Sequence, residues 1–295
     1  MSSVERQQAA TDTDAAEIDG SQIAGWSPSF TRRLAGILRP ILKWYFRLEV
    51  RGLDNFPPGE ALVVANHSGG FFAFDIQILG VHFYERFGYL RPMYTLSHNL
   101  IFTRITSWFL ARTGFIRATH DNALQALRNG AVVVTFPGGD YDAFRPTFRQ
   151  NVIDFAGRTG YVRTAVDAGA PLVPAVSIGL QETQLFLARG TRLARWLGLK
   201  RRLRTDVFPI TFGFPFGLLG APLNLPLPSK VIIQVLEPID IVAEFGKACC
   251  CHQAHIPRSN DCQFHGPQYS ACYVDKFVLR PVPATVSMYP LIRKM

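Results

Sequence analysis

Hydrophobic and polar positions follow two patterns along the chain. Short apolar runs, each followed within a few residues by glycine or proline, predict buried β-strands. These runs occupy residues 61–65, 131–136, 171–178 and 231–236. Between them, apolar residues three and four positions apart predict helices, over 31–48, 121–129 and 161–168. Alternation of the two patterns predicts an α/β fold, with one central, mostly parallel β-sheet flanked by helices.

Two basic segments are predicted to be amphipathic helices. The first, over 31–48, opens the folded part of the chain and is expected to break or kink near Pro40. The second covers 181–204 and carries Arg189, Arg192 and Arg195 three residues apart. Between 207 and 227 the chain is uncharged but holds four prolines, which predicts an irregular apolar surface or pocket wall. No run approaches the roughly 18 apolar residues that cross a bilayer.

Composition separates the two ends from the middle. Residues 1–30 are interpreted as a disordered leader, because 1–20 carry five acids and one arginine and lack a signal-like apolar stretch. Residues 31–245 form the predicted domain. All five cysteines lie in 246–295, which shows neither helix nor strand period, so we expect an atypical, frame-shifted or disordered tail. Its Cys and His residues lack the paired spacing of a zinc site, and no metal is expected.

Charge and hydropathy narrow the function. Hydrophobic residues make up 48% of the chain, which excludes general disorder. The net charge is +9, and 189–204 hold seven basic residues and no acid. Such segments suit an anionic membrane or a nucleic acid. No nucleic-acid motif or aromatic stacking platform accompanies them, so nucleic acid is not expected as a partner.

Candidate chemistry follows the predicted strands. The strand over 61–65 leads into Asn66-His67-Ser68-Gly69-Gly70, and the strand over 131–136 into Pro137-Gly138-Gly139. Taken alone, His67 fits a structural role as well as a catalytic one, Asp75 fits a helix cap, and the glycine pair fits a turn. The order of three segments changes this interpretation. They are N-H-S-G-G-F-F-A-F-D (66–75), G-F-I-R (114–117) and F-P-G-G-D-Y-D (136–142).

This series resembles the glycerolipid acyltransferase superfamily, and its third segment resembles the mono- and diacylglycerol acyltransferase-like branch. The resemblance implies an acyltransferase-like domain that transfers a fatty acyl group from acyl-CoA or an acyl carrier protein to a glycerolipid hydroxyl. These thioesters are co-substrates, and no separate cofactor is implied. The expected location is peripheral, at the cytoplasmic face of an anionic membrane.

Within this resemblance His67 is the candidate general base, and Asp75 the carboxylate that orients it. The family's first motif usually places four residues between them, whereas this chain has seven. As a continuous helix that spacing separates the two residues by about 12 Å, so Gly69 and Gly70 must turn the chain back.

The other two segments supply the candidate substrate-binding residues. They are Gly114, Arg117, Phe136, Pro137, Gly138, Gly139, Asp142 and, just beyond, Arg145. Arg117 is expected to bind an anionic part of a substrate. Gly138 and Tyr141 stand where the phosphate-acceptor branch has Glu and Arg, which favours a neutral glyceride. Lysophosphatidic acid remains an alternative if Arg145 supplies the missing guanidinium.

A second hypothesis is a catalytically silent, peripheral lipid-binding protein of the same fold, in which the longer His-to-Asp spacing has disabled the site.

Overall fold

The computed structural model describes residues 23–203, 205–220 and 224–241. The predicted tail, with its cysteines, and most of the predicted leader lie outside the described residues. Ile23 and Trp26, placed in the leader by prediction, instead pack against the body.

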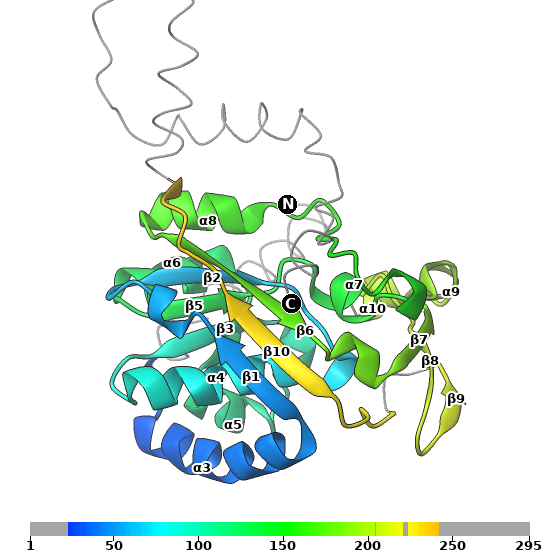
Figure 1. Ribbon diagram of the computed structural model, residues 1–295. Helices are drawn as coiled ribbons and strands as arrows, with labels where there is room; N and C mark the ends of the chain where they lie inside the picture. Colours follow the sequence, from blue (N-terminus) through cyan, green and yellow to red (C-terminus); the bar gives the residue numbers. More distant parts are fainter. Residues whose placement is uncertain (1–22, 204, 221–223, 242–295) are drawn as a thin grey trace, which may run out of the picture.

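A mostly parallel sheet forms the centre of the molecule, as predicted, and it has seven strands (Figure 1). Only β6 and β10 pair antiparallel in the sheet as described; the other neighbours are parallel. Its spatial order is β1 (Arg47–Arg51), β10 (Lys230–Val235), β6 (Leu172–Ile178), β2 (Ala61–Ala65), β5 (Val132–Thr135), β3 (Met93–Ser97) and β4 (Phe115–Arg117).

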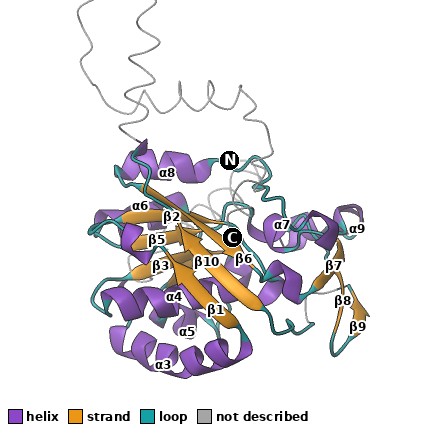
Figure 2. Ribbon diagram, in the orientation of Figure 1, coloured by secondary structure: helices purple, strands orange, loops and turns teal. Residues whose placement is uncertain are grey.

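Helices cover both faces of this sheet (Figure 2). One face packs against α3 (Pro28–Tyr45) and α4 (Phe74–Phe87), and the other against α6 (His120–Arg128) and α8 (Gly160–Ala168). Side chains of β2 alternate between the two layers, with Val63 facing the first and Leu62 the second. Two shorter helices, α5 (Ser107–Arg112) and α7 (Gly139–Ala143), lie in the connections.

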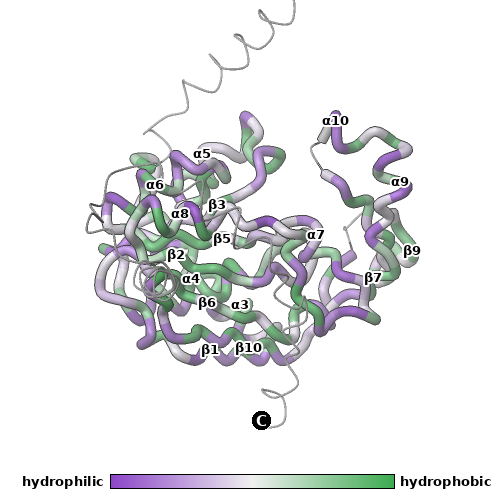
Figure 3. Tube along the Cα trace, turned by 90° about the horizontal axis from the view of Figure 1, so that it is seen from above, coloured by the Kyte–Doolittle hydropathy of each residue, from purple (hydrophilic) through white to green (hydrophobic). Residues whose placement is uncertain are grey.

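A small lobe projects from one side of the body. It contains a three-stranded antiparallel sheet and two short helices (Figures 1 and 3). Its elements are β7 (Leu185–Ala188), α9 (Thr191–Trp196), α10 (Leu199–Leu203), β8 (Ile210–Gly213) and β9 (Gly217–Leu219).

Two predicted helices differ from the structure. The first runs through Pro40 and ends at Tyr45, because Arg47–Arg51 pairs with β10 as an edge strand. The predicted helix over 181–204 is wrong. Its residues form a 3-10 turn, β7, α9 and α10, with Gly190 and Gly198 in left-handed conformations that end a helical path.

The described residues of the uncharged segment 207–227 expose several large apolar side chains, as predicted, although part of the segment is regular strand rather than irregular chain. None of the helices in the described ranges is long and apolar enough to span a bilayer.

Candidate active site

Three central strands bring the candidate residues to one edge of the sheet. β2 is buried along its whole length and lies between β5 and β6, and all three run in the same direction. The carboxyl ends of parallel strands meet at one edge, so the loop after β2 faces the loop after β5. His67 follows β2, and Phe136 follows β5. Their rings are 4.8 Å apart between centroids.

His67 and Asp75 meet in spite of their long spacing. The Nδ1 atom of His67 lies 2.9 Å from Oδ2 of Asp75. The His67 side chain is 17% exposed and the Asp75 side chain 3%. A carboxylate only accepts hydrogen bonds, so Nδ1 carries the proton in the neutral imidazole and Nε2 keeps its lone pair.

Left-handed backbone conformations turn the chain back between the two residues, as predicted for the glycine pair. Gly69 has φ 81° and Gly70 φ 68°. Ala73, at φ 48°, is a non-glycine residue in the same region and immediately precedes α4. This turn places Asp75 in the first turn of α4, with its carboxylate directed at the preceding loop.

Asp75 fits its alternative role as a helix cap only in part. Ala73 occupies the cap position, while Asp75 accepts the amide hydrogen of Ile76 at 2.9 Å. Its other oxygen accepts the Ser68 amide at 2.9 Å as well as His67. The carboxylate therefore joins the start of α4 to the His67 loop.

Charges around His67 raise the pKa of its imidazole above the ordinary value of a histidine. Burial is the largest single influence and favours the neutral form, but the adjacent Asp75 carboxylate and the charge of Asp142 outweigh it. Arg145 opposes that increase. The site therefore stabilises the imidazolium that forms when His67 accepts a proton.

Asp142 and Arg145 form a buried ion pair beneath the loop, and Arg145 also lines a small recess there. The Arg145 guanidinium bonds to the Asp142 carboxylate and lies 3.2 Å from the Ser68 hydroxyl. Asp142 accepts the His67 amide hydrogen at 2.8 Å. Burial raises the pKa of the Asp142 carboxyl, and Arg145 partly offsets this. Both residues were predicted to bind substrate, and in the structure both also support the His67 loop.

The glycines of the third segment also serve packing. A Cβ on Gly138 would lie 2.2 Å from the Asp142 Cβ, so no other residue fits. The Gly139 amide donates to the Phe136 carbonyl oxygen at 2.9 Å within the turn. Arg158 contacts the Pro137 carbonyl oxygen at 3.3 Å.

The second segment lies farther along the sheet edge. Gly114 has φ 86°, and a Cβ there would lie 2.5 Å from the Met93 carbonyl oxygen, so strand crowding explains this glycine. Arg117, at the end of β4, places its guanidinium 5.1 Å from the Phe102 ring centroid. β4 is three strands from β2, which corresponds to about 14 Å. β4, which carries Arg117, is consequently well separated from the strand that leads into His67.

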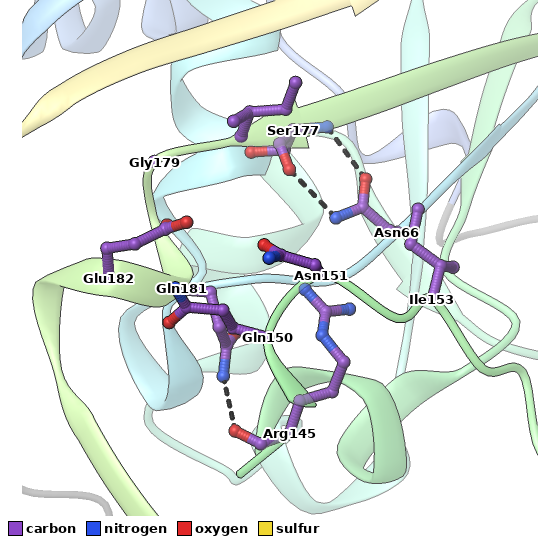
Figure 4. A pocket seen from close by; sticks show the side chains of 10 residues that line it. Asn66, Arg145, Gln150, Asn151, Ile153, Ser177, Gly179, Gln181 and Glu182 are labelled. Atoms are coloured by element: carbon purple, nitrogen blue, oxygen red, sulfur yellow. Dashed lines mark hydrogen bonds between the residues drawn. The ribbon is translucent and has the colours of Figure 1, made fainter. Parts of the chain in front are cut away.

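Three buried residues of this network were not predicted as functional. The Asn66 side chain donates to the Ser177 carbonyl oxygen at 3.0 Å and accepts its amide hydrogen at 2.7 Å, which joins the end of β2 to β6. Gln181 donates to the Arg145 carbonyl oxygen at 2.8 Å. The three residues line a recess of about 50 Å³ below the His67 loop (Figure 4). Asn66 adjoins His67 in the motif, but Ser177 and Gln181 have no local sequence signal.

The described part of the chain holds no group of three or more His, Cys, Asp or Glu residues that could bind a metal. The rejected zinc site of the tail lies outside that part.

Comparisons with known proteins agree with the motifs. A family model described as Acyltransferase matches residues 47–178. A Mycobacterium tuberculosis (strain H37Rv) protein described as uncharacterized is 35% identical over 73% of this chain and 58% of its own length. The Mus musculus "DGAT1/2-independent enzyme synthesizing storage lipids" is 28% identical over 64% of this chain and 55% of its own.

Among solved structures, the 1-acyl-sn-glycerophosphate acyltransferase PlsC of Thermotoga maritima matches with a TM-score of 0.44 and 19% identity. The match covers 87% of this chain and 80% of that one.

The chain matches the Acyltransferase family over residues 47–178, a match that ends at β6. It spans somewhat more than half the length of the curated relatives that it matches.

Proposed function

We propose that this protein transfers a fatty acyl group from a thioester, acyl-CoA or acyl-carrier protein, to the hydroxyl of a glycerolipid. The observation that carries the proposal is the 2.9 Å contact between His67 Nδ1 and Asp75 at the carboxyl edge of the sheet. The family match supports the reaction class.

His67 acts as the general base. A lipid hydroxyl is a weak nucleophile at neutral pH, and it gains reactivity when a base removes its proton during attack. With Nδ1 engaged by Asp75, Nε2 accepts that proton. The hydroxyl oxygen bonds to the thioester carbonyl carbon, which becomes tetrahedral.

Asp75 acts through His67 as a positioning residue. Its carboxylate holds the ring in the required tautomer and stabilises the imidazolium. When the tetrahedral intermediate collapses, the carbon–sulfur bond breaks and the thiolate takes the proton from His67. The products are an ester and a free thiol, and the base is regenerated.

The contact between His67 and Asp75 supports the catalytic proposal over the catalytically silent alternative. That hypothesis rested on the long His-to-Asp spacing, and the left-handed turn at Gly69 and Gly70 brings the two side chains into contact.

We further propose a neutral acceptor, such as a monoacylglycerol. Arg145 is engaged by Asp142 and Ser68, so it does not supply the guanidinium missing at Tyr141. An unpaired phosphate beside His67 would be costly. Arg117, about 14 Å along the sheet, is better placed for the phosphate groups of the donor, which lie far from its thioester.

Both substrates carry lipid chains, so we propose peripheral contact with an anionic membrane. In α3, exposed Ile37, Ile41 and Trp44 accompany basic residues, and α9 and α10 add exposed arginine and lysine.

The test is a matrix of donors and acceptors with purified protein. Acyl-CoA and acyl-carrier protein are each combined with monoacylglycerol, diacylglycerol and lysophosphatidic acid. Ester and free thiol are measured together. The proposal expects equal amounts of both, only when thioester and hydroxyl are present. Thiol release without ester would indicate a thioesterase and contradict it.

A further inference from the structure

The small lobe has an outer face of unusual composition. Strand residues alternate between two faces, and cross-strand pairs share a face. Leu185 pairs with Phe212, and Phe212 with Leu218, which makes an apolar row across all three strands. All three side chains are exposed, with Phe212 52% and Leu218 66% accessible.

The inner face of the same sheet packs on the candidate active site. Phe186, between two outward-facing leucines, is buried and lies 6.0 Å from the Phe144 ring between centroids. A Cβ on Gly70 would lie 3.0 Å from the Phe186 ring. One layer of β-strand therefore separates the outer apolar face from the loop that carries His67.

The apolar face extends beyond the strands. Phe214 and Phe216, in the connection between β8 and β9, are both more than half exposed. The Tyr45 hydroxyl donates to the Pro226 carbonyl oxygen at 2.6 Å, which joins this segment to the end of α3 next to the exposed Trp44. This bond brings the chain after β9 next to the end of α3.

The apolar face itself is uncharged, whereas basic side chains lie beside it. Residues 207–227 contain no charged side chain. The neighbouring α9 and α10 present exposed basic side chains beside the exposed Trp196, and they lie on the same side of the body as β7 and β9 (Figure 3). An uncharged apolar surface with a basic border complements a bilayer of anionic lipid.

We propose that the outer face of the β7–β8–β9 sheet inserts into the membrane surface and holds the His67 loop at the lipid interface. We define this face by Leu185, Leu187, Phe212, Phe214, Phe216 and Leu218. The occupant is a lipid bilayer. The role given to this face rests on the proposed function, but binding of the protein to vesicles can be measured without acyl transfer.

The experiment compares the full chain with the F212Q/L218Q variant in flotation with phosphatidylcholine vesicles, with and without phosphatidylglycerol. Both side chains are exposed, so the variant is expected to fold. Bound fraction should fall at least tenfold on both vesicle types. L90Q is the matched control, because Leu90 is 93% exposed and lies outside the lobe. Its binding should equal that of the unmodified protein.

Activity distinguishes failure of this inference from failure of the proposed function. With short-chain substrates dispersed as monomers, the variant should keep its rate within twofold, whereas on vesicle substrates the rate should fall at least tenfold. Unchanged flotation of F212Q/L218Q overturns the membrane face, whether or not the protein transfers acyl groups. A concentration-dependent dimer that the variant abolishes, with vesicle binding unchanged, assigns the face to a second copy and also overturns it.

Discussion

The body and the small lobe use apolar residues in opposite ways. In the body, strands such as β2 and β5 bury nearly every side chain between two helical layers. In the lobe, β7 and β8 bury one face and expose leucine and phenylalanine on the other. Burying such a side chain is worth about 1.5–3 kcal/mol, so the lobe leaves a substantial free energy available for association.

The same contrast applies to polar groups. The His67 loop is joined to Asp75, Asp142 and Arg145 by buried or partly buried hydrogen bonds, whereas the arginines of α9 are exposed. A connected buried network holds a group in one geometry, and exposed charges on long side chains adapt to a surface. We therefore expect substitutions in the body to change chemistry and stability, and those in the lobe to change where the protein works.

The largest expected effect belongs to His67. Replacement His67→Ala should reduce the acyl-transfer rate by about 10⁴-fold, because the base is lost, while vesicle flotation stays unchanged. His82→Ala, in α4, is the matched control and should retain activity. Activity of His67→Ala within threefold of the unmodified protein would reject the assignment.

Breaking the buried ion pair should be next in magnitude. Asp142→Ala leaves Arg145 buried without its partner and should lower the free energy of unfolding by about 3–5 kcal/mol. Asp140→Ala, in the same short helix, removes more exposed contacts with Arg158 and the Thr205 hydroxyl and should cost about 1–2 kcal/mol. Urea unfolding measures both. Equal costs would show that Asp142 does not support the loop.

Asp75→Asn should lower the rate less than His67→Ala, by roughly 10²–10³-fold, because the base remains but its tautomer is no longer held. In the unmodified protein His67 must be neutral to act, so the rate should rise with pH through the raised pKa of its imidazole. Loss of the carboxylate lowers that pKa, so the variant's profile should move to lower pH. A profile that stays in place would assign the titration to another group.

The next prediction concerns which acceptor lipid the site in the body prefers. Monoacylglycerol should be used about tenfold better than lysophosphatidic acid of the same chain length, because Arg145 is engaged inside the loop support. Arg117→Ala should raise KM for acyl-CoA more than KM for the acceptor. Direct competition between the two acceptors measures this preference. If the protein prefers lysophosphatidic acid and Arg117→Ala loses that preference, Arg117 binds the acceptor rather than the donor.

The smallest effect is expected from the basic border of the lobe. Each of Arg192→Gln and Arg195→Gln should weaken binding to anionic vesicles by about 1 kcal/mol, or roughly fivefold, with no change on neutral vesicles. The difference should vanish at high salt because charges at a surface are screened. Arg128→Gln, on α6 of the body, is the control. An equal loss in this control would indicate that only net charge matters.

Local sequence predicted four strands of the body, β2, β5, β6 and β10, but not β1, β3 or β4. The run over 61–65 is β2 to the residue, and the helices at 121–129 and 161–168 agree with α6 and α8 within one residue at each end. Buried strands and amphipathic helices carry their periodicity in consecutive residues, so a single segment reveals them. The motif order also indicated the meeting of His67 and Asp75, which the two glycines make possible.

Other features depended on residues far apart in the chain. From the motif alone, Asp142 and Arg145 were predicted to bind substrate. Only the fold shows that both lie under the His67 loop. Ser177 and Gln181 join the network from beyond β5 with no local signal. The segment over 181–204 has helical spacing, yet β7 forms because β8 supplies its partner. Pairing and burial decided these outcomes, since both are properties of neighbours in space rather than of consecutive residues.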